Sequence, residues 1–176
     1  MKILKALLIA VVVLAVLVFG GGMLISPKYR IQRSTLINAP AEKAYALVAD
    51  PQGWKRWSVW NQRDPGMKIE YFGAASGVGA GWAWKSATEG DGKMTMTAAE
   101  PNQRVVFELY FPDFDSPSTG TIAFTPEGAG TRVTWSMDGD MGKNPIGHWM
   151  GLMMDSMVGK DFDAGLANLK ALAEKP

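Results

Sequence analysis

The C-terminal stretch from Gly147 to Glu174 constrains the fold most, because it predicts one long amphipathic helix. Its apolar residues follow one another three or four positions apart, a spacing that places them on one face of an α-helix. These residues are Met154, Val158, Phe162, Leu166, Leu169 and Ala173. Charged side chains such as Asp155 and Lys160 fall on the other faces. A helix of this length needs a large apolar surface to pack against, so the rest of the chain must supply one.

Most of the chain before this helix predicts β-strands. Residues 29–37 form the first expected strand, and Pro40 and Pro51 then favour two short helices. From residue 67 onward, apolar and polar residues alternate, which is typical of strands with one buried face. The later expected strands are residues 67–72, 82–86, 93–99, 104–111, 119–125 and 131–137. The predicted fold is therefore α+β: a curved antiparallel sheet of about seven strands around the long helix.

The first 25 residues predict a transmembrane anchor. Residues 6–25 carry no charge, and at about 1.5 Å per residue they span roughly the 30 Å of a hydrocarbon core. A secretory signal peptide, cut near Gly20, Gly21 and Gly22, is the alternative. A short basic start before the apolar run favours a cytoplasmic N-terminus. We therefore expect a single-pass protein of the cell membrane, with the domain of residues 29–174 on the extracytoplasmic side.

Composition excludes several functional classes. The formal net charge is +1 and there is no long basic run, so we expect no nucleic-acid partner. The chain has no cysteine and one histidine, which disfavours thiolate and histidine-rich metal centres. The glycine-rich stretch of residues 77–81 is not followed by the lysine and helix of a phosphate-binding loop. We expect neither a metal nor another cofactor.

Four stretches of sequence resemble the START and polyketide-cyclase-like superfamily, which has the helix-grip fold. They are residues 38–57, 77–84, 130–135 and 165–170, and in this order they extend over nearly all of the chain after the anchor. The resemblance implies a helix-grip fold with a cavity between the long helix and the sheet. It does not imply one activity, because the superfamily includes lipid carriers, hormone receptors and cyclases.

Methionine and tryptophan side chains are the candidate lining of such a cavity. Methionine adapts to varied apolar shapes, and tryptophan adds a large apolar area with one polar N–H group. The predicted ligand-binding residues are Trp82, Trp84, Met94, Met96, Phe107, Leu109, Phe124, Trp135, Met153, Met154, Met157 and Val158. Ordinary core packing is the alternative for all of them. Gly159, inside the predicted helix, indicates close approach of a ligand or a strand.

Binding of a hydrophobic or lipid-like small molecule is therefore the leading functional hypothesis. A cyclase or dehydratase is the second, and a non-catalytic membrane accessory protein is the third. His148 is the candidate general base for an enzyme, with Glu70, Glu108, Tyr110 or Asp113 as its partner. A capping or solvated role at the helix start is the favoured explanation of His148, so we assign no catalytic residue.

Overall fold

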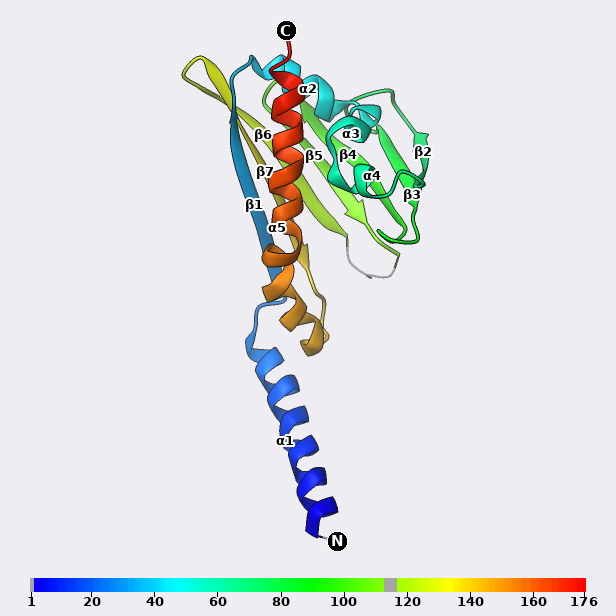
Figure 1. The fold of residues 1–176 in the computed structure, drawn as a ribbon, viewed down its shortest axis with the longest axis vertical. Helices are drawn as coiled ribbons and strands as arrows, with labels where there is room; N and C mark the ends of the chain where they lie inside the picture. Colours follow the sequence, from blue (N-terminus) through cyan, green and yellow to red (C-terminus); the bar gives the residue numbers. More distant parts are fainter. Residues whose placement is uncertain (1, 113–116) are drawn as a thin grey trace.

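The computed structural model describes residues 2–112 and 117–176. These residues form five helices and one seven-stranded antiparallel sheet of order β1-β7-β6-β5-β4-β3-β2 (Figure 1). The helices are α1 (Lys2–Leu24), α2 (Ala41–Ala49), α3 (Pro51–Trp57), α4 (Val59–Arg63) and α5 (Pro145–Ala173). The strands are β1 (Lys28–Ile37), β2 (Lys68–Phe72), β3 (Gly81–Lys85), β4 (Gly92–Glu100), β5 (Arg104–Tyr110), β6 (Ser118–Glu127) and β7 (Gly130–Asp140). The predicted fold class is confirmed.

The first and last strands lie side by side, although the chain between them is long. β1 pairs with β7 in one continuous register from Lys28 opposite Asp140 to Ile37 opposite Thr131. The buried residues of β1, β4, β5 and β6 follow the predicted alternation, so that one face of the sheet is apolar. Helix α5 packs over β1 and β7, while α2 and α3 lie over the rest of this inner face (Figure 1).

Three short helices, rather than two, follow the first strand. Pro51 stands at the first position of α3, and the Asp50 carboxylate accepts a hydrogen bond from the Gln52 backbone N–H at 2.8 Å. Ser58 then separates α3 from α4. Trp54 and Trp57 of α3 are buried, which makes α3 part of the core.

Helix α5 begins at Pro145, and the side chain of Asn144 caps it by accepting from the Ile146 N–H at 3.0 Å. Its C-terminal half buries four residues of the predicted stripe: Phe162, Leu166, Leu169 and Ala173. Met154 and Val158 are half-buried against the same core. The predicted packing face of the long helix is thus confirmed.

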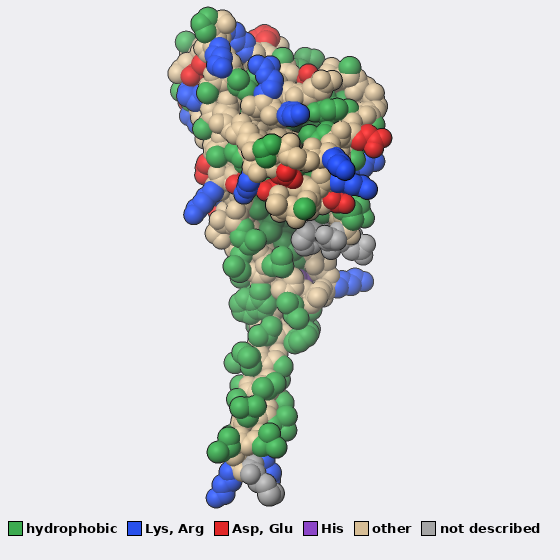
Figure 2. Space-filling model, turned by 45° about the vertical axis from the view of Figure 1, so that its right-hand side comes forward, with side chains coloured by type: hydrophobic (Ala, Val, Ile, Leu, Met, Phe, Trp, Pro, Cys, Tyr) green, Lys and Arg blue, Asp and Glu red, His purple; other side chains and the backbone are tan. Residues whose placement is uncertain are grey.

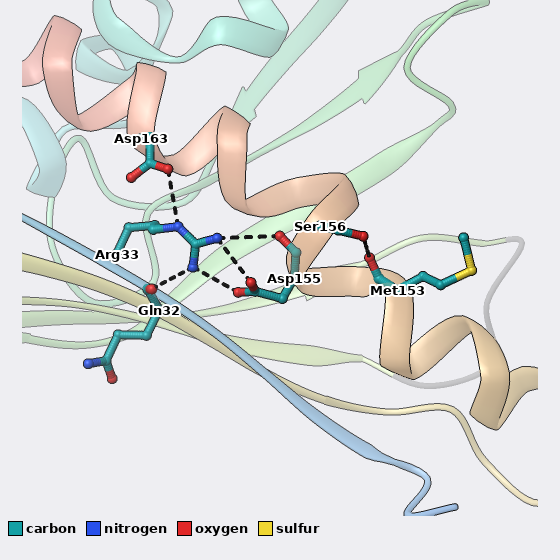
Figure 3. A network of polar contacts seen from close by, with 6 residues as sticks. All are labelled: Gln32, Arg33, Met153, Asp155, Ser156 and Asp163. Carbon is teal, nitrogen blue, oxygen red and sulfur yellow. Dashed lines mark hydrogen bonds and ion pairs between the residues drawn. The ribbon is translucent and has the colours of Figure 1, made fainter.

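Arg33 of β1 forms ion pairs with Asp155 and Asp163 in the middle of α5, a group here called the Arg33 clamp (Figure 3). The Arg33 guanidinium donates to Asp155 Oδ1 at 2.8 Å and to Asp163 Oδ2 at 3.1 Å. The hydrogen bond from Arg33 holds the pKa of the Asp155 carboxyl below its ordinary value. A Cβ atom on Gly159 would lie 2.0 Å from Arg33 Nη2, so the glycine makes room for the guanidinium. The close approach expected at Gly159 comes from a strand.

The C-terminal end of α1 packs on the first turns of α5. A Cβ atom on Gly22 would lie 2.3 Å from the Pro145 carbonyl oxygen, and one on Gly21 would lie 2.8 Å from the Trp149 ring. The Trp149 indole N–H donates to the Val18 carbonyl at 2.9 Å. The helix continues through these glycines to Leu24, and the small size of Gly21 and Gly22 allows the contact with α5.

Gly22→Ala is expected to separate α1 from α5, since the new methyl group meets backbone atoms that cannot rotate away. Gly20→Ala is the matched control, because nothing lies within 4 Å of a Cβ atom there. The measurement is the distance between spin labels on Val11→Cys and Ala167→Cys in the full chain. We expect a broader distance distribution for Gly22→Ala than for Gly20→Ala. Equal distributions would contradict the glycine contact.

Candidate functional site

The candidate site is the apolar inner face of the sheet together with the helices that cover it. Ten of the twelve predicted lining residues meet there. Those buried at 1–5% exposure are Trp82, Met94, Met96, Phe107, Phe124 and Trp135. Those half-buried against this core are Trp84, Leu109, Met154 and Val158. The sequence alternation therefore assigned these side chains to one side of the sheet and one face of α5.

Met153 and Met157 do not join this group. Their side chains are 55% and 54% exposed. Each lies one position before a residue of the buried stripe, and a single step rotates a side chain by about 100° around the helix. Figure 3 shows Met153 pointing away from the Arg33 clamp. These two methionines belong to an outer surface and not to the inner face.

Aromatic rings fill the space between α5 and the sheet, where the sequence predicted a hollow. Trp135 stands in their centre, stacked on Phe162 with ring centroids 3.9 Å apart. Trp54, Trp57 and Trp60, from α3 and α4, approach the Trp135 ring edge-on at 5.3–5.8 Å. The short helices thus supply rings that occupy the expected cavity, and the expectation of an open hollow is not met in this structure.

Two cavities in the described part of the chain lie outside this space. One, of about 160 Å³, is lined by the start of α3, the end of β2 and the loop that follows β2. Burial raises the pKa of its Tyr71 hydroxyl, and the negative charge of Asp50 adds to this effect. The other, of about 250 Å³, is lined by Lys93, Thr95, Glu108 and Tyr110 on the outer face of the sheet.

The indole N–H of Trp135 differs from those of its neighbours on the inner face because it lacks a hydrogen-bond acceptor in the described part of the chain. Trp54 and Trp57 donate their indole N–H groups to the carbonyls of Val48 and Leu47, at 2.8 and 3.2 Å. Trp135 Nε1 is buried and has no hydrogen-bond partner among the described residues. An unsatisfied buried donor costs about 1–3 kcal/mol. The sequence marked Trp135 as a lining residue but could not show that its donor is unpaired.

Ionisable groups are scarce in the core. Within residues 2–112 and 117–176, the buried polar side chains are those of Ser58, Thr131, Ser136 and His148. No group of three potential metal ligands occurs among the same residues. Of the candidate partners of His148, Glu108 and Tyr110 lie across the sheet at the outer cavity. Asp113 lies outside the described residues.

His148 instead joins α1 to the link before α5. Its Nδ1 lies 2.8 Å from the Gly22 carbonyl oxygen, and its Nε2 lies 3.0 Å from the Gly142 carbonyl oxygen. Both partners can only accept, so both ring nitrogens donate when the imidazole is protonated. The carbonyl of Gly142, followed by that of Gly22, raises the pKa of His148 above its ordinary value. The negative charge of Asp140 acts in the same direction.

Protonation of His148 is expected to strengthen the contact between α1 and α5. Because the pKa is raised in the folded state, this contribution is complete below the unfolded pKa of about 6.5. It is lost as the pH rises through the folded pKa. His148 is the single histidine, so its ring resonance in a proton NMR titration reports the pKa without overlap from another histidine. We expect a value above 6.5, lowered by Gly22→Ala; a value at or below 6.5 would contradict this geometry.

Comparison with known sequences gives one family. Residues 28–174 match the family described as "Polyketide cyclase / dehydrase and lipid transport". A search of curated proteins found no match.

Solved structures with the same fold include proteins of different activity. The chain superimposes on a protein of Chromobacterium violaceum with a TM-score of 0.62 at 17% identity, covering 84% of this chain and 99% of that one. A di-domain ARO/CYC protein of the steffimycin biosynthetic pathway gives 0.66 at 13%, covering 84% and 51%. Truncated norcoclaurine synthase from Thalictrum flavum gives 0.64 at 14%, covering 85% and 95%. At these identities the likeness shows the fold alone.

Proposed function

This chain belongs to the polyketide cyclase/dehydrase and lipid transport family, and from that premise we propose that it binds an apolar or amphipathic small molecule without changing it chemically. The observation that carries the proposal is the unpaired Trp135 N–H in the centre of an apolar aromatic core. A bound molecule with one acceptor oxygen satisfies this donor, while its apolar part is buried against the surrounding rings. Lipids and fatty acids have this combination of groups.

Binding requires that two side chains make room. Phe162 covers one face of Trp135, and Trp60 lies edge-on to both rings. Trp60 belongs to the five-residue helix α4 and is only half-buried. In the bound state its ring and that of Phe162 turn aside, and the ligand takes their place. The half-buried Met154, eight positions before Phe162 on the same helix, adapts to the shape of the ligand.

Ligand binding is favoured over a cyclase or dehydratase reaction by the residues of the core. Such a reaction needs an acid or base beside the substrate. Among the described residues, the buried side chain with an ordinary pKa near neutrality is His148, and it is held at the junction of α1 and α5. This placement supports binding as the better proposal.

Helix α1 tethers the binding domain, residues 29–174, to the membrane in this proposal. It has 23 residues of mean hydropathy 2.9 over its most apolar window, which satisfies the length and composition of a membrane span. The domain lies on the extracytoplasmic side. A reporter enzyme that is active only outside the cytoplasm, fused after Pro176, is expected to be active; activity of a cytoplasmic reporter alone would overturn this placement.

The binding proposal is tested by extracting the purified full chain with organic solvent and analysing the extract by mass spectrometry. We expect one class of apolar molecule in a fixed ratio to protein, and saturable quenching of tryptophan emission by brominated fatty acid. Trp135→Phe keeps a ring but removes the donor, and should weaken fatty-acid binding several-fold, as expected for one hydrogen bond. Trp149→Phe, near α1, is the matched control. Absence of both co-purified ligand and saturable quenching would overturn the proposal.

A further inference from the structure

The first turns of α5 carry an exposed apolar surface that the binding site does not use. Its side chains are between 42% and 64% exposed. They are Ile146, Trp149, Met150, Leu152, Met153 and Met157, here called the α5 apolar face. Figure 2 shows hydrophobic side chains continuing without a break from the α1 rod onto the lower end of the molecule. A contiguous exposed patch of this kind indicates an interaction surface.

Acidic and basic side chains are absent from the exposed side of this part of the helix and begin at Asp155. The segment from Ile146 to Met154 contains no Asp, Glu, Lys or Arg, and its one ionisable side chain, His148, is buried. The next position is Asp155, which pairs with Arg33, and Asp163 follows on the same clamp (Figure 3). In Figure 2 most charged side chains lie above the apolar zone, and a basic side chain also lies at its edge beside the histidine. This division is the one expected at a boundary between lipid and water.

The contacts with α1 fix the depth of the α5 apolar face. Trp149 donates to Val18, and Pro145 lies against Gly22, so this face stands beside the last turns of α1. With 23 residues at about 1.5 Å each, α1 is about 35 Å long, against about 30 Å for a hydrocarbon core. The last turns of a spanning α1 therefore lie near the membrane boundary, where tryptophan is enriched.

We propose that the first turns of α5 lie in the bilayer surface, with lipid acyl chains covering the α5 apolar face. This inference rests on the membrane tether of the proposed function, and adds a second, non-spanning contact with the same leaflet. The half-buried Met154 and Val158 lie on the same stretch of helix but face the core. The helix thus presents one side to lipid and the adjacent side to the binding site.

Site-specific labelling of the full chain tests the inference, because the protein has no cysteine of its own. An environment-sensitive fluorophore is placed on Leu152→Cys, and in separate variants on Ala167→Cys and Val12→Cys. Ala167 is an exposed residue of the same helix far from α1, and Val12 lies in the middle of α1. Each variant is reconstituted in phosphatidylcholine vesicles with nitroxide lipids. We expect quenching at residue 152 to exceed that at residue 167 several-fold, with shallow nitroxides most effective.

The outcomes separate this inference from the tether. Quenching at residue 12 without quenching at residue 152 overturns the α5 contact and leaves the tether intact. Absence of quenching at both positions removes the tether itself. Self-quenching between labels at residue 152 that grows with the protein-to-lipid ratio would show that a second copy covers the face, which also overturns the inference.

Discussion

Phe162→Ala is expected to lower the free energy of unfolding by about 3–5 kcal/mol, as for other large-to-small changes in packed cores. Phe162 is 1% exposed, and its ring stacks on Trp135 at a 10° interplanar angle. Removing the ring leaves a cavity beside the unpaired Trp135 N–H, because the tryptophans around it are held from other elements. The loss is measured by urea unfolding of the full chain in lipid nanodiscs, followed by near-UV circular dichroism.

The same variant should gain affinity for small apolar ligands. The cavity is lined mainly by aromatic rings, so a molecule such as indole or benzene can fill it and recover part of the lost stability. Lys160→Ala is the matched control on the same helix, and its exposed position outside the α5 apolar face predicts a change within about 0.5 kcal/mol. A loss below about 1 kcal/mol in Phe162→Ala would show that Phe162 is not part of a packed core.

Val12→Arg combined with Val16→Arg is expected to remove the protein from the membrane fraction. Both residues are exposed in the middle of α1. On insertion scales, each arginine at the centre of a span costs about 2.5–3.5 kcal/mol, so the pair opposes insertion by roughly 5–7 kcal/mol. The measurement is the fraction of protein that stays with membranes after extraction at alkaline pH.

Val12→Leu combined with Val16→Leu is the control, and it should stay in the membrane fraction as the original chain does. The intact mass of the purified protein then distinguishes an anchor from a signal peptide. A retained N-terminal segment agrees with the anchor. A mature chain that starts at or after the glycines of residues 20–22 would contradict it.

The sheet and the long helix could be predicted from sequence because their hydrophobic periods are regular. Val133, Trp135 and Met137 alternate along β7, and all three are buried as expected. The stripe from Phe162 to Ala173 keeps its spacing over the buried half of α5. Local signals were also sufficient for the start of α3, because Pro51 favours a short helix and stands at the first position of one in the structure.

The contents of the inner face could not be predicted, because they depend on contacts between distant segments. Trp54, Trp57 and Trp60 follow one another three residues apart, but this spacing does not show that their rings pack on Trp135. Whether an indole N–H finds an acceptor depends on atoms far away in sequence. Met153 and Met157 were predicted as lining residues because methionine suits an apolar cavity. In the structure their positions on α5 leave both side chains exposed.

The glycines of α1 also illustrate this limit. In sequence they indicate a candidate cleavage site, and this interpretation uses local information alone. The structure gives them a role through Pro145 and Trp149, more than a hundred positions away. The same junction holds His148, which explains why the single histidine is buried without belonging to the inner face.

Binding at the inner face is tested most directly by the indole N–H resonance of Trp135 in the ¹⁵N-labelled full chain, assigned by its absence in Trp135→Phe. On titration with a long-chain fatty acid, this resonance should move downfield as the N–H gains an acceptor, and the resonance of Trp149 should change little. A Trp135 resonance that stays in place at every fatty-acid concentration would contradict binding between α5 and the sheet.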